Sequence, residues 1–250
     1  MLKIVENTKQ VEVKTSGGDV EIIDVYGEVQ AKTSGGDIII KNNKARVDAK
    51  TSGGDVILEN VGAEVDVATS GGDIEVSGSA GDIEVSTSGG DVELTDIKGK
   101  AQARTSGGDI EASTVLNGID VSTSGGDIEL RDIQGFIEGS TSGGDIEAEM
   151  TLKDFSKDHH IELKSSVGNI TLHIPEKLPA TIKAEIKLTG FASRTKEYNI
   201  YSDFPLNAEQ SGDEEYRGEI LISKDGKING GGDLIYLRTT NGNINIKKLR

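Results

Sequence analysis

The pentapeptide Thr-Ser-Gly-Gly-Asp recurs eight times in this chain, and each copy begins 18 residues after the one before it. The copies begin at Thr15, Thr33, Thr51, Thr69, Thr87, Thr105, Thr123 and Thr141. No residue is inserted or deleted between copies, so a physical constraint must hold them in register. Stacking of one copy on the next supplies that constraint, because stacked coils need equal perimeters.

Each unit contains two short segments in which apolar and polar residues alternate. Counted from its threonine, the unit that begins at Thr87 has apolar residues at positions 6 and 8 (Val92 and Leu94) and at positions 15 and 17 (Ala101 and Ala103). A period of two is typical of a strand with one buried face. We therefore predict two strands of about five residues in each unit.

The strands could form an antiparallel meander or a parallel solenoid. Invariant spacing favours the solenoid, because a meander tolerates hairpins of different lengths. We predict an all-β, parallel β-solenoid, right-handed, of about eleven two-stranded coils. It forms a single domain over residues 1–250. Residues 1–150 are regular repeats. Residues 151–250 form irregular coils, with an insertion at 191–222 that fits no coil and a C-terminal closing coil.

Each of the two turns has positions that carry similar residues from unit to unit, and we call such a set of equivalent positions a column. Position 10, in the second turn, carries residues suited to an Asx-type turn: Asp24, Asn42, Asn60, Gly78, Asp96, Thr114 and Asp132. Position 13 is mostly Gly, which suggests a positive φ there. Residues 78–85 closely match residues 87–94, nine positions later, so the coil is a doubled nine-residue unit.

Charge is distributed unevenly. Residues 1–150 hold 12 basic and 29 acidic side chains, a balance of −17, whereas residues 151–250 hold 15 and 14. This balance argues against nucleic acid and anionic membrane surfaces as partners. The chain has no Cys, which removes thiolate chemistry. No apolar run approaches the ~18 residues of a membrane span, so we expect no membrane insertion.

The fifth residue of each pentapeptide forms an aspartate column, the one candidate cation site in the sequence. Its members are Asp19, Asp37, Asp55, Asp73, Asp91, Asp109, Asp127 and Asp145. Calcium-binding β-rolls use Gly-Gly-x-Gly-x-Asp, and the second Gly-x-Asp step is missing here. We therefore expect hydrogen bonds from the stacked turns, rather than calcium or another cofactor, to offset the repulsion between the carboxylates.

Other candidate sites have weaker support. The threonine column has one Thr per coil, in phase with the inward positions, which argues against an ice-binding face. His159 and His160 lie in a six-residue insertion and are interpreted as a solvated loop pair rather than as metal ligands. No metalloprotease, nucleophile-elbow or P-loop motif occurs. The segment 191–222 gathers five of the nine aromatic residues and is interpreted as a cover for the solenoid.

The repeated Ser-Gly-Gly-Asp-[Val/Ile]-Glu unit resembles the DUF4097 family of bacterial adhesin-like repeat proteins. The segments 163–182, 201–206 and 228–248 resemble the closing part of that family, so the resemblance runs from about residue 10 to residue 248. It implies a β-solenoid in a cell-envelope or surface setting and no known reaction. Partners there would be proteins or polysaccharides. The N-terminal residues show no secretory signal, which predicts a cytoplasmic location if the chain is complete.

Together these features predict a non-catalytic, acidic structural or adhesin-like binding module. Two alternatives stay open, a polysaccharide-active β-helix enzyme and a calcium-dependent β-roll.

Overall fold

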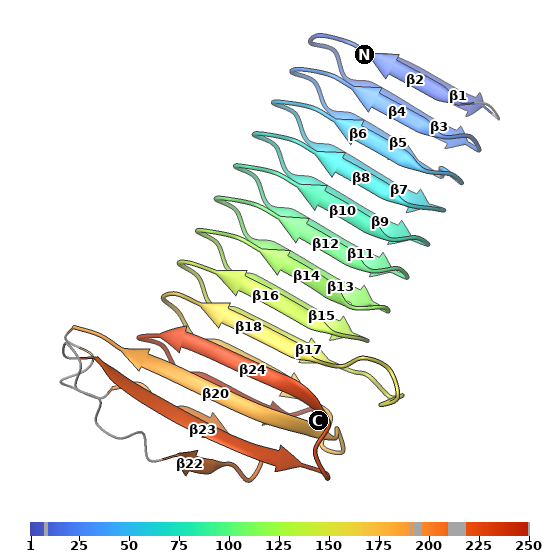
Figure 1. Ribbon diagram of the computed structural model, residues 1–250. Helices are drawn as coiled ribbons and strands as arrows, with labels where there is room; N and C mark the ends of the chain where they lie inside the picture. Colours follow the sequence, from blue (N-terminus) through green and yellow to red (C-terminus); the bar gives the residue numbers. More distant parts are fainter. Residues whose placement is uncertain (8–9, 191, 193–196, 210–218, 250) are drawn as a thin grey trace. The chain divides into compact units, whose positions relative to one another are not determined.

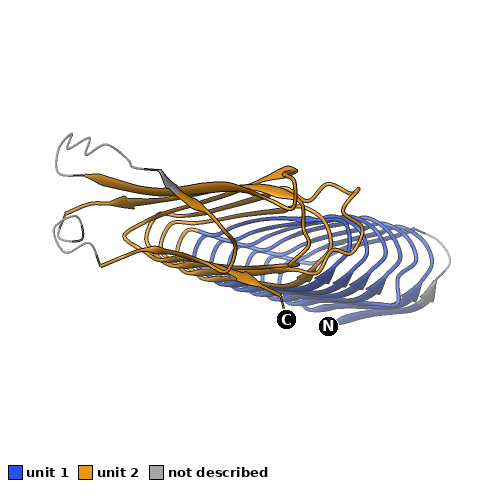
Figure 2. Ribbon diagram, turned by 90° about the horizontal axis from the view of Figure 1, so that it is seen from below, with its two compact units in different colours: residues 1–123 blue, residues 124–250 orange. Residues whose placement is uncertain are grey.

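The structure is a computed structural model that describes residues 1–7, 10–190, 192, 197–209 and 219–249. The chain divides into two compact units, residues 1–123 and 124–250, which Figure 2 shows in different colours. The elements whose bounds lie within the described residues are all strands. None of these residues belongs to a helix long and apolar enough to cross a membrane.

Unit 1 contains two parallel sheets built from alternate strands (Figure 1). The first sheet consists, in order, of β1 (Leu2–Asn7), β3 (Val20–Val25), β5 (Ile38–Lys41), β7 (Val56–Val61), β9 (Ile74–Ser79), β11 (Val92–Ile97) and β13 (Ile110–Val115). The second consists of β2 (Val11–Lys14), β4 (Val29–Lys32), β6 (Val47–Lys50), β8 (Val65–Ala68), β10 (Ile83–Ser86), β12 (Ala101–Arg104) and β14 (Ile119–Ser122).

Within unit 1, successive strands of a sheet are 18 residues apart and pair in parallel. Val92, for example, lies opposite Ile74 on one side and Ile110 on the other. Like positions of successive units are therefore neighbours, and the predicted parallel β-solenoid is confirmed.

The core of unit 1 lies between the two sheets and is made of the predicted inward positions. Val92 and Leu94 from one sheet and Ala103 from the other are at most 1% exposed. Position 11 adds a further buried column at the second turn, with Ile97 and Val115 fully buried. Burying an aliphatic side chain of this size contributes about 1.5–3 kcal/mol, and repetition of the columns multiplies that gain along the unit.

The second turn takes its left-handed residue at position 10. The six non-glycine residues at position 10 have φ between 52° and 58°, and Gly78, the glycine at this position, has a φ of 76°. The prediction of positive φ at position 13 is wrong for Gly81 and Gly99, which are glycine for another reason. A Cβ at Gly81 would lie 2.5 Å from the carbonyl carbon of Ala63, and one at Gly99 would lie 2.4 Å from that of Gly81. Close stacking of coils excludes the side chain.

Unit 2 continues the two-sheet plan with longer and less regular strands. One sheet has the order β15 (Ile128–Ile133), β17 (Ile146–Met150), β19 (Ile170–Ile174), β25 (Ile244–Lys248) and β21 (Ile200–Ser202). The other has the order β16 (Ile137–Thr141), β18 (Ile161–Ser165), β24 (Asp233–Thr240), β20 (Ala180–Leu188), β23 (Ile220–Ile228) and β22 (Asn207–Glu209).

The order of strands in unit 2 differs from the order in the sequence. The last coil of the chain, β24 and β25, lies inside the sheets, because β24 pairs with both β18 and β20 and β25 pairs with both β19 and β21. Strands β20 to β23 and β22 to β23 pair antiparallel. The C-terminal coil was expected to close the array, yet β21 and β22 are the outermost strands.

The segment 191–222 also differs from expectation, because part of it fits the coil plan. Residues 200–202 form β21, which extends a parallel sheet. Phe204 is buried as a cover residue should be, whereas Tyr201 is 54% exposed. Phe191 and Tyr216 lie outside the described residues. The single domain and the right-handed sense stay predictions.

Candidate functional site

The aspartate column is a hydrogen-bond ladder between neighbouring coils. From Asp19 to Asp91 in unit 1, the Oδ1 atom of each Asp accepts the backbone N–H of the Asp in the next coil, at 2.8 Å for Asp73 to Asp55, Asp91 to Asp73 and Asp109 to Asp91. In unit 2 the same bond joins Asp145 to Asp127 at 2.7 Å. These bonds satisfy backbone donors that the first turn would otherwise leave to solvent.

Asparagine takes over this position at the far end of unit 2. The N–H of Asn169 donates to Asp145 Oδ1 at 2.7 Å, and that of Asn243 donates to Asn169 Oδ1 at 2.9 Å. The ladder therefore needs a side-chain oxygen and does not need the charge. The described residues contain no group of three or more His, Asp or Glu side chains placed to hold a metal ion. Independence from calcium stays a prediction.

Asp73→Asn is expected to leave the unfolding midpoint unchanged or to raise it. Asparagine keeps the Oδ1 acceptor and removes one charge from a column in which neighbours about 5 Å apart repel by roughly 0.8 kcal/mol in water. Asp73→Leu, which removes the acceptor, should cost about 1 kcal/mol. Thermal unfolding of the three proteins in excess chelator measures both effects. Loss of the folded state in chelator would show that the column holds a cation.

The threonine column and the second glycine of each pentapeptide form a second ladder beside the first. Thr105 Oγ1 donates to the carbonyl oxygen of Gly90 at 2.8 Å and accepts the N–H of Gly108 at 3.3 Å. The Thr side chain is 6% exposed. A buried hydroxyl that is bonded within the turn cannot form an ice-binding face, so this column holds coils together.

The two histidines of the insertion anchor the loop between β17 and β18. His159 is 4% exposed, so its interpretation as a solvated residue is wrong. Its Nδ1 lies 2.7 Å from the carbonyl oxygen of Lys157, and its Nε2 lies 2.9 Å from that of Pro179. The backbone N–H of His159 donates to Asp233 at 3.0 Å. These contacts tie the loop to the segments before β20 and at the start of β24.

His160 stacks on Phe136, with ring centroids 5.2 Å apart, and lies between two carboxylates. Its Nε2 is 3.0 Å from Glu138 and its Nδ1 is 2.7 Å from Asp158. Partial burial acts to lower the pKa of His160, but the bonds to Glu138 and Asp158 outweigh it, so the pKa is raised above its ordinary value of 6.5. The same bond to His160 lowers the pKa of Asp158.

We expect unit 2 to lose stability as the pH rises above 6.5. A raised histidine pKa contributes stability that is fully present below the unfolded value and is lost as the pH passes the folded value. Unfolding midpoints measured from about pH 5.5 to about pH 8.5 should fall, and the fall should be smaller in His160→Gln. An identical slope in both proteins would contradict this role for His160.

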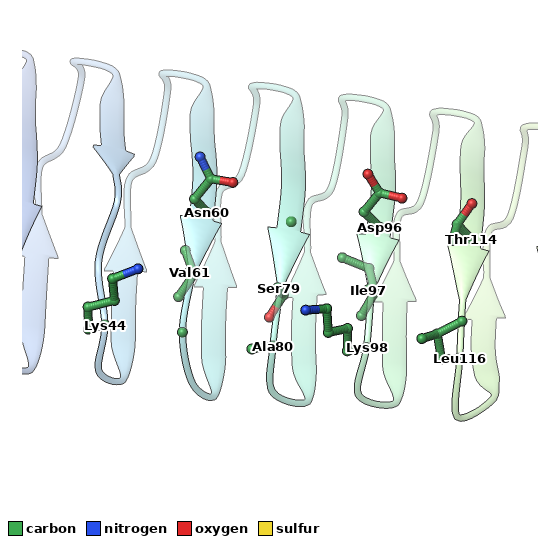
Figure 3. Close-up of a pocket in the computed structure, with 12 residues that line it drawn as sticks. Lys44, Asn60, Val61, Ser79, Ala80, Asp96, Ile97, Lys98, Thr114 and Leu116 are labelled. Carbon is green, nitrogen blue, oxygen red and sulfur yellow. The ribbon is translucent and has the colours of Figure 1, made fainter.

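A groove of about 370 Å³ lies on the second-turn side of unit 1, and we call it the second-turn groove (Figure 3). Its floor is formed by the buried position-11 residues Val61, Ser79 and Ile97. Position-10 residues, among them Asn60 and Asp96, form one rim. The groove is apolar at its base and polar at its edges, which is typical of small binding sites.

Small residues in one coil create the hollow. The coil from Thr69 to Ser86 has Gly78-Ser79-Ala80-Gly81 at its second turn. This is the stretch that copies the first-turn sequence, and its Asp82 repeats the ladder by accepting the N–H of Lys100 at 2.8 Å. The doubling of a nine-residue unit is therefore visible in the bonding. A turn of first-turn type carries no large side chain, so the surface is hollowed here.

Position 12 forms the other rim, and its side chains change along the unit. Gly62 and Ala80 occupy the middle of the groove, with Lys44 before them and Lys98 and Leu116 after them. Figure 3 shows Lys44 and Lys98 on opposite sides of Ala80, with both side-chain nitrogens directed toward the space between them. Neither ammonium group has an ion pair with a carboxylate of the described residues.

Sequence reasoning concentrated on the columns that repeat and missed this groove. The signal was present as a break in the position-12 column, where Gly62 and Ala80 interrupt a run of Tyr26, Lys44 and Lys98. The predicted Asp residues all lie on the opposite, first-turn side of the coil and do not line the groove.

A second hollow of about 390 Å³ lies in unit 2 among β21, β25 and β23. It is lined in part by the exposed Tyr201 and by Lys224, whose Nζ donates to the carbonyl oxygen of Ile200 at 2.7 Å. Asp203 also bonds within the chain, because its Oδ2 accepts the N–H of Lys248 at 3.1 Å. The charged side chains of Lys224 and Asp203 in this hollow thus hold β21 in place. We therefore regard the second-turn groove as the stronger candidate for a binding site.

The chain was compared with family models, curated proteins and solved structures. A model described as Toastrack DUF4097 matches residues 5–78 and 59–247, which is nearly the whole chain. No curated protein and no solved structure matches. The matched ranges cover most of both units, including the turns that form the ladders. The chain therefore belongs to the Toastrack family, DUF4097.

Proposed function

We propose that this chain is a non-catalytic binding module, in which the two ladders build a regular acidic body and the second-turn groove takes the ligand. The observation that carries the proposal is the break in the repeat. The turn backbones bond to neighbouring coils at the groove as elsewhere in unit 1, but at the groove Lys44 and Lys98, which have no ion pair with a carboxylate of the described residues, flank a hollow left by small residues.

The composition of the groove supports binding without catalysis. Glycoside hydrolysis by the usual route needs two carboxylates facing one bond. Asp96 is the one carboxylate among the residues that line the groove. The described residues of the groove include no histidine that could serve as a general base.

Selection of peptides from a phage-displayed random library, with a groove-filled variant as counter-selection, tests the proposal. Ala80→Tyr fills the groove with a side chain that position 12 already carries at Tyr26, which is 58% exposed. We expect enriched peptides to bind the parent chain and to lose binding to Ala80→Tyr. An array of oligosaccharides, read with the same two proteins, forms the second arm. If neither arm yields a binder that Ala80→Tyr abolishes, the chain has no ligand at this groove and the proposal is wrong.

A further inference from the structure

We infer that the second-turn groove binds an extended acidic peptide, with acidic residues at positions i and i+4 and an apolar residue at i+2. This assignment rests on the proposed binding role of the groove and adds the class of ligand. It derives from the spacing of three features along one edge of unit 1.

The first feature is the separation of the two lysines. Lys44 follows β5 and Lys98 follows β11, and these strands are three steps apart in the sheet. Neighbouring strands are about 4.8 Å apart, so the two backbones are separated by roughly 14 Å. The gap at Gly62 and Ala80 lies midway, roughly 7 Å from each lysine.

The second feature is the match to an extended chain. Residues in a strand advance about 3.4 Å each and alternate between faces. Side chains at i, i+2 and i+4 therefore share one face, with about 7 Å between neighbours and about 14 Å between the outer pair. Two acidic side chains then reach Lys44 and Lys98 while the middle side chain enters the hollow. Asp96 on the opposite rim repels acidic residues there and keeps the acidic pair on the lysine side.

The third feature is the chemistry of the hollow and of the turn backbone. The exposed Ala80 and the half-buried Leu116 line the hollow and favour an apolar side chain, whereas sugar hydroxyls placed there would lack partners. The N–H groups of Ala80 and Lys98 already donate to the carbonyl oxygens of Val61 and Ser79, at 2.9 and 2.8 Å. The ligand is therefore held by its side chains and not by strand addition.

Fluorescence anisotropy with labelled, end-capped pentapeptides at about 0.15 M salt tests the inference. Glu-Ser-Leu-Ser-Glu should bind. Lys-Ser-Leu-Ser-Lys should not, because its charges oppose Lys44 and Lys98. Glu-Leu-Ser-Ser-Glu keeps the charges but turns leucine to the other face, and it should bind about tenfold more weakly.

Protein variants separate the contributions of the two lysines and of the hollow to peptide binding. Lys44→Gln and Lys98→Gln should each weaken binding of Glu-Ser-Leu-Ser-Glu by about two- to fivefold, and the double variant by about tenfold. Lys32→Gln, on β4 and away from the groove, is the matched control and should bind as the parent does. Ala80→Tyr should abolish binding.

Four outcomes would overturn the inference. Equal binding of the acidic and basic peptides would do so, as would parental affinity in the double lysine variant. The third is binding of a carboxylated oligosaccharide, oligogalacturonate, that Ala80→Tyr abolishes while no peptide binds. That result rejects the acidic peptide and leaves the binding function standing. Absence of any groove-dependent binder rejects both.

Discussion

Gly90→Ala is expected to destabilise unit 1 by about 3 kcal/mol, an effect at the upper end for overpacking. A Cβ at Gly90 would lie 2.1 Å from the carbonyl oxygen of Gly72, which belongs to the backbone of the previous coil. Relief of that contact requires the two coils to separate. Separation would stretch the bond from Thr87 Oγ1 to the Gly72 carbonyl oxygen, which is 2.8 Å long.

Gly89→Ala is the matched control, one residue away in the same turn. Its Cβ would be 3.5 Å from the nearest atom, an ordinary contact. Alanine restricts the unfolded chain more than glycine, so this variant should be stabilised by about 0.4–1 kcal/mol. Urea unfolding of both variants measures the difference. Equal destabilisation would contradict the account of close stacking at the second glycine alone.

Leu94→Asp is expected to cost about 3–5 kcal/mol, because the position is fully buried between two sheets and offers no partner for a charge. Glu93→Lys, at the next residue but on the outer face, should change stability by less than about 0.5 kcal/mol. The new lysine would lie between Glu75 and Glu111 in register and would relieve their repulsion. Comparable losses in the two variants would show that the inward and outward faces are assigned wrongly.

The sequence predicted the architecture of residues 1–150 well because one interval fixes several physical quantities at once. An exact period of 18 sets the coil perimeter, and the alternation at Val92 and Leu94 sets the buried face. Residue type indicated a turn at position 10, but the positive φ was expected at position 13 and lies at position 10, where Asp and Asn tolerate the left-handed region.

The arrangement of unit 2 could not be predicted in the same way. The order β18, β24, β20 depends on which strand fills a gap in space, and no local pattern encodes that choice. The burial of His159 depends likewise on Pro179 and Asp233, which are distant in sequence. The spacing of the insertion predicted a loop but not what the loop packs against.

The candidate site was missed for a different reason. A repeat draws attention to its constant positions, yet the ladders show that those positions are occupied by bonds between coils. A ligand needs side-chain groups that are free of such bonds, and among the described residues Lys44 and Lys98 supply them where the pattern fails, on either side of Gly62 and Ala80. The break in a column was the informative signal.

Site-specific labelling on the two turns of one coil tests most directly whether the second-turn groove, and not the ladder side, binds ligand. The chain has no Cys, so Ala80→Cys and Gly71→Cys each give one thiol whose rate of modification by a small thiol reagent can be measured. Gly71 lies on the first turn of the same coil, where the nearest atom to a Cβ is 3.7 Å away. Excess Glu-Ser-Leu-Ser-Glu should slow modification of the thiol at position 80, which the bound peptide covers, with no change at position 71. A response at position 71 alone would contradict the account.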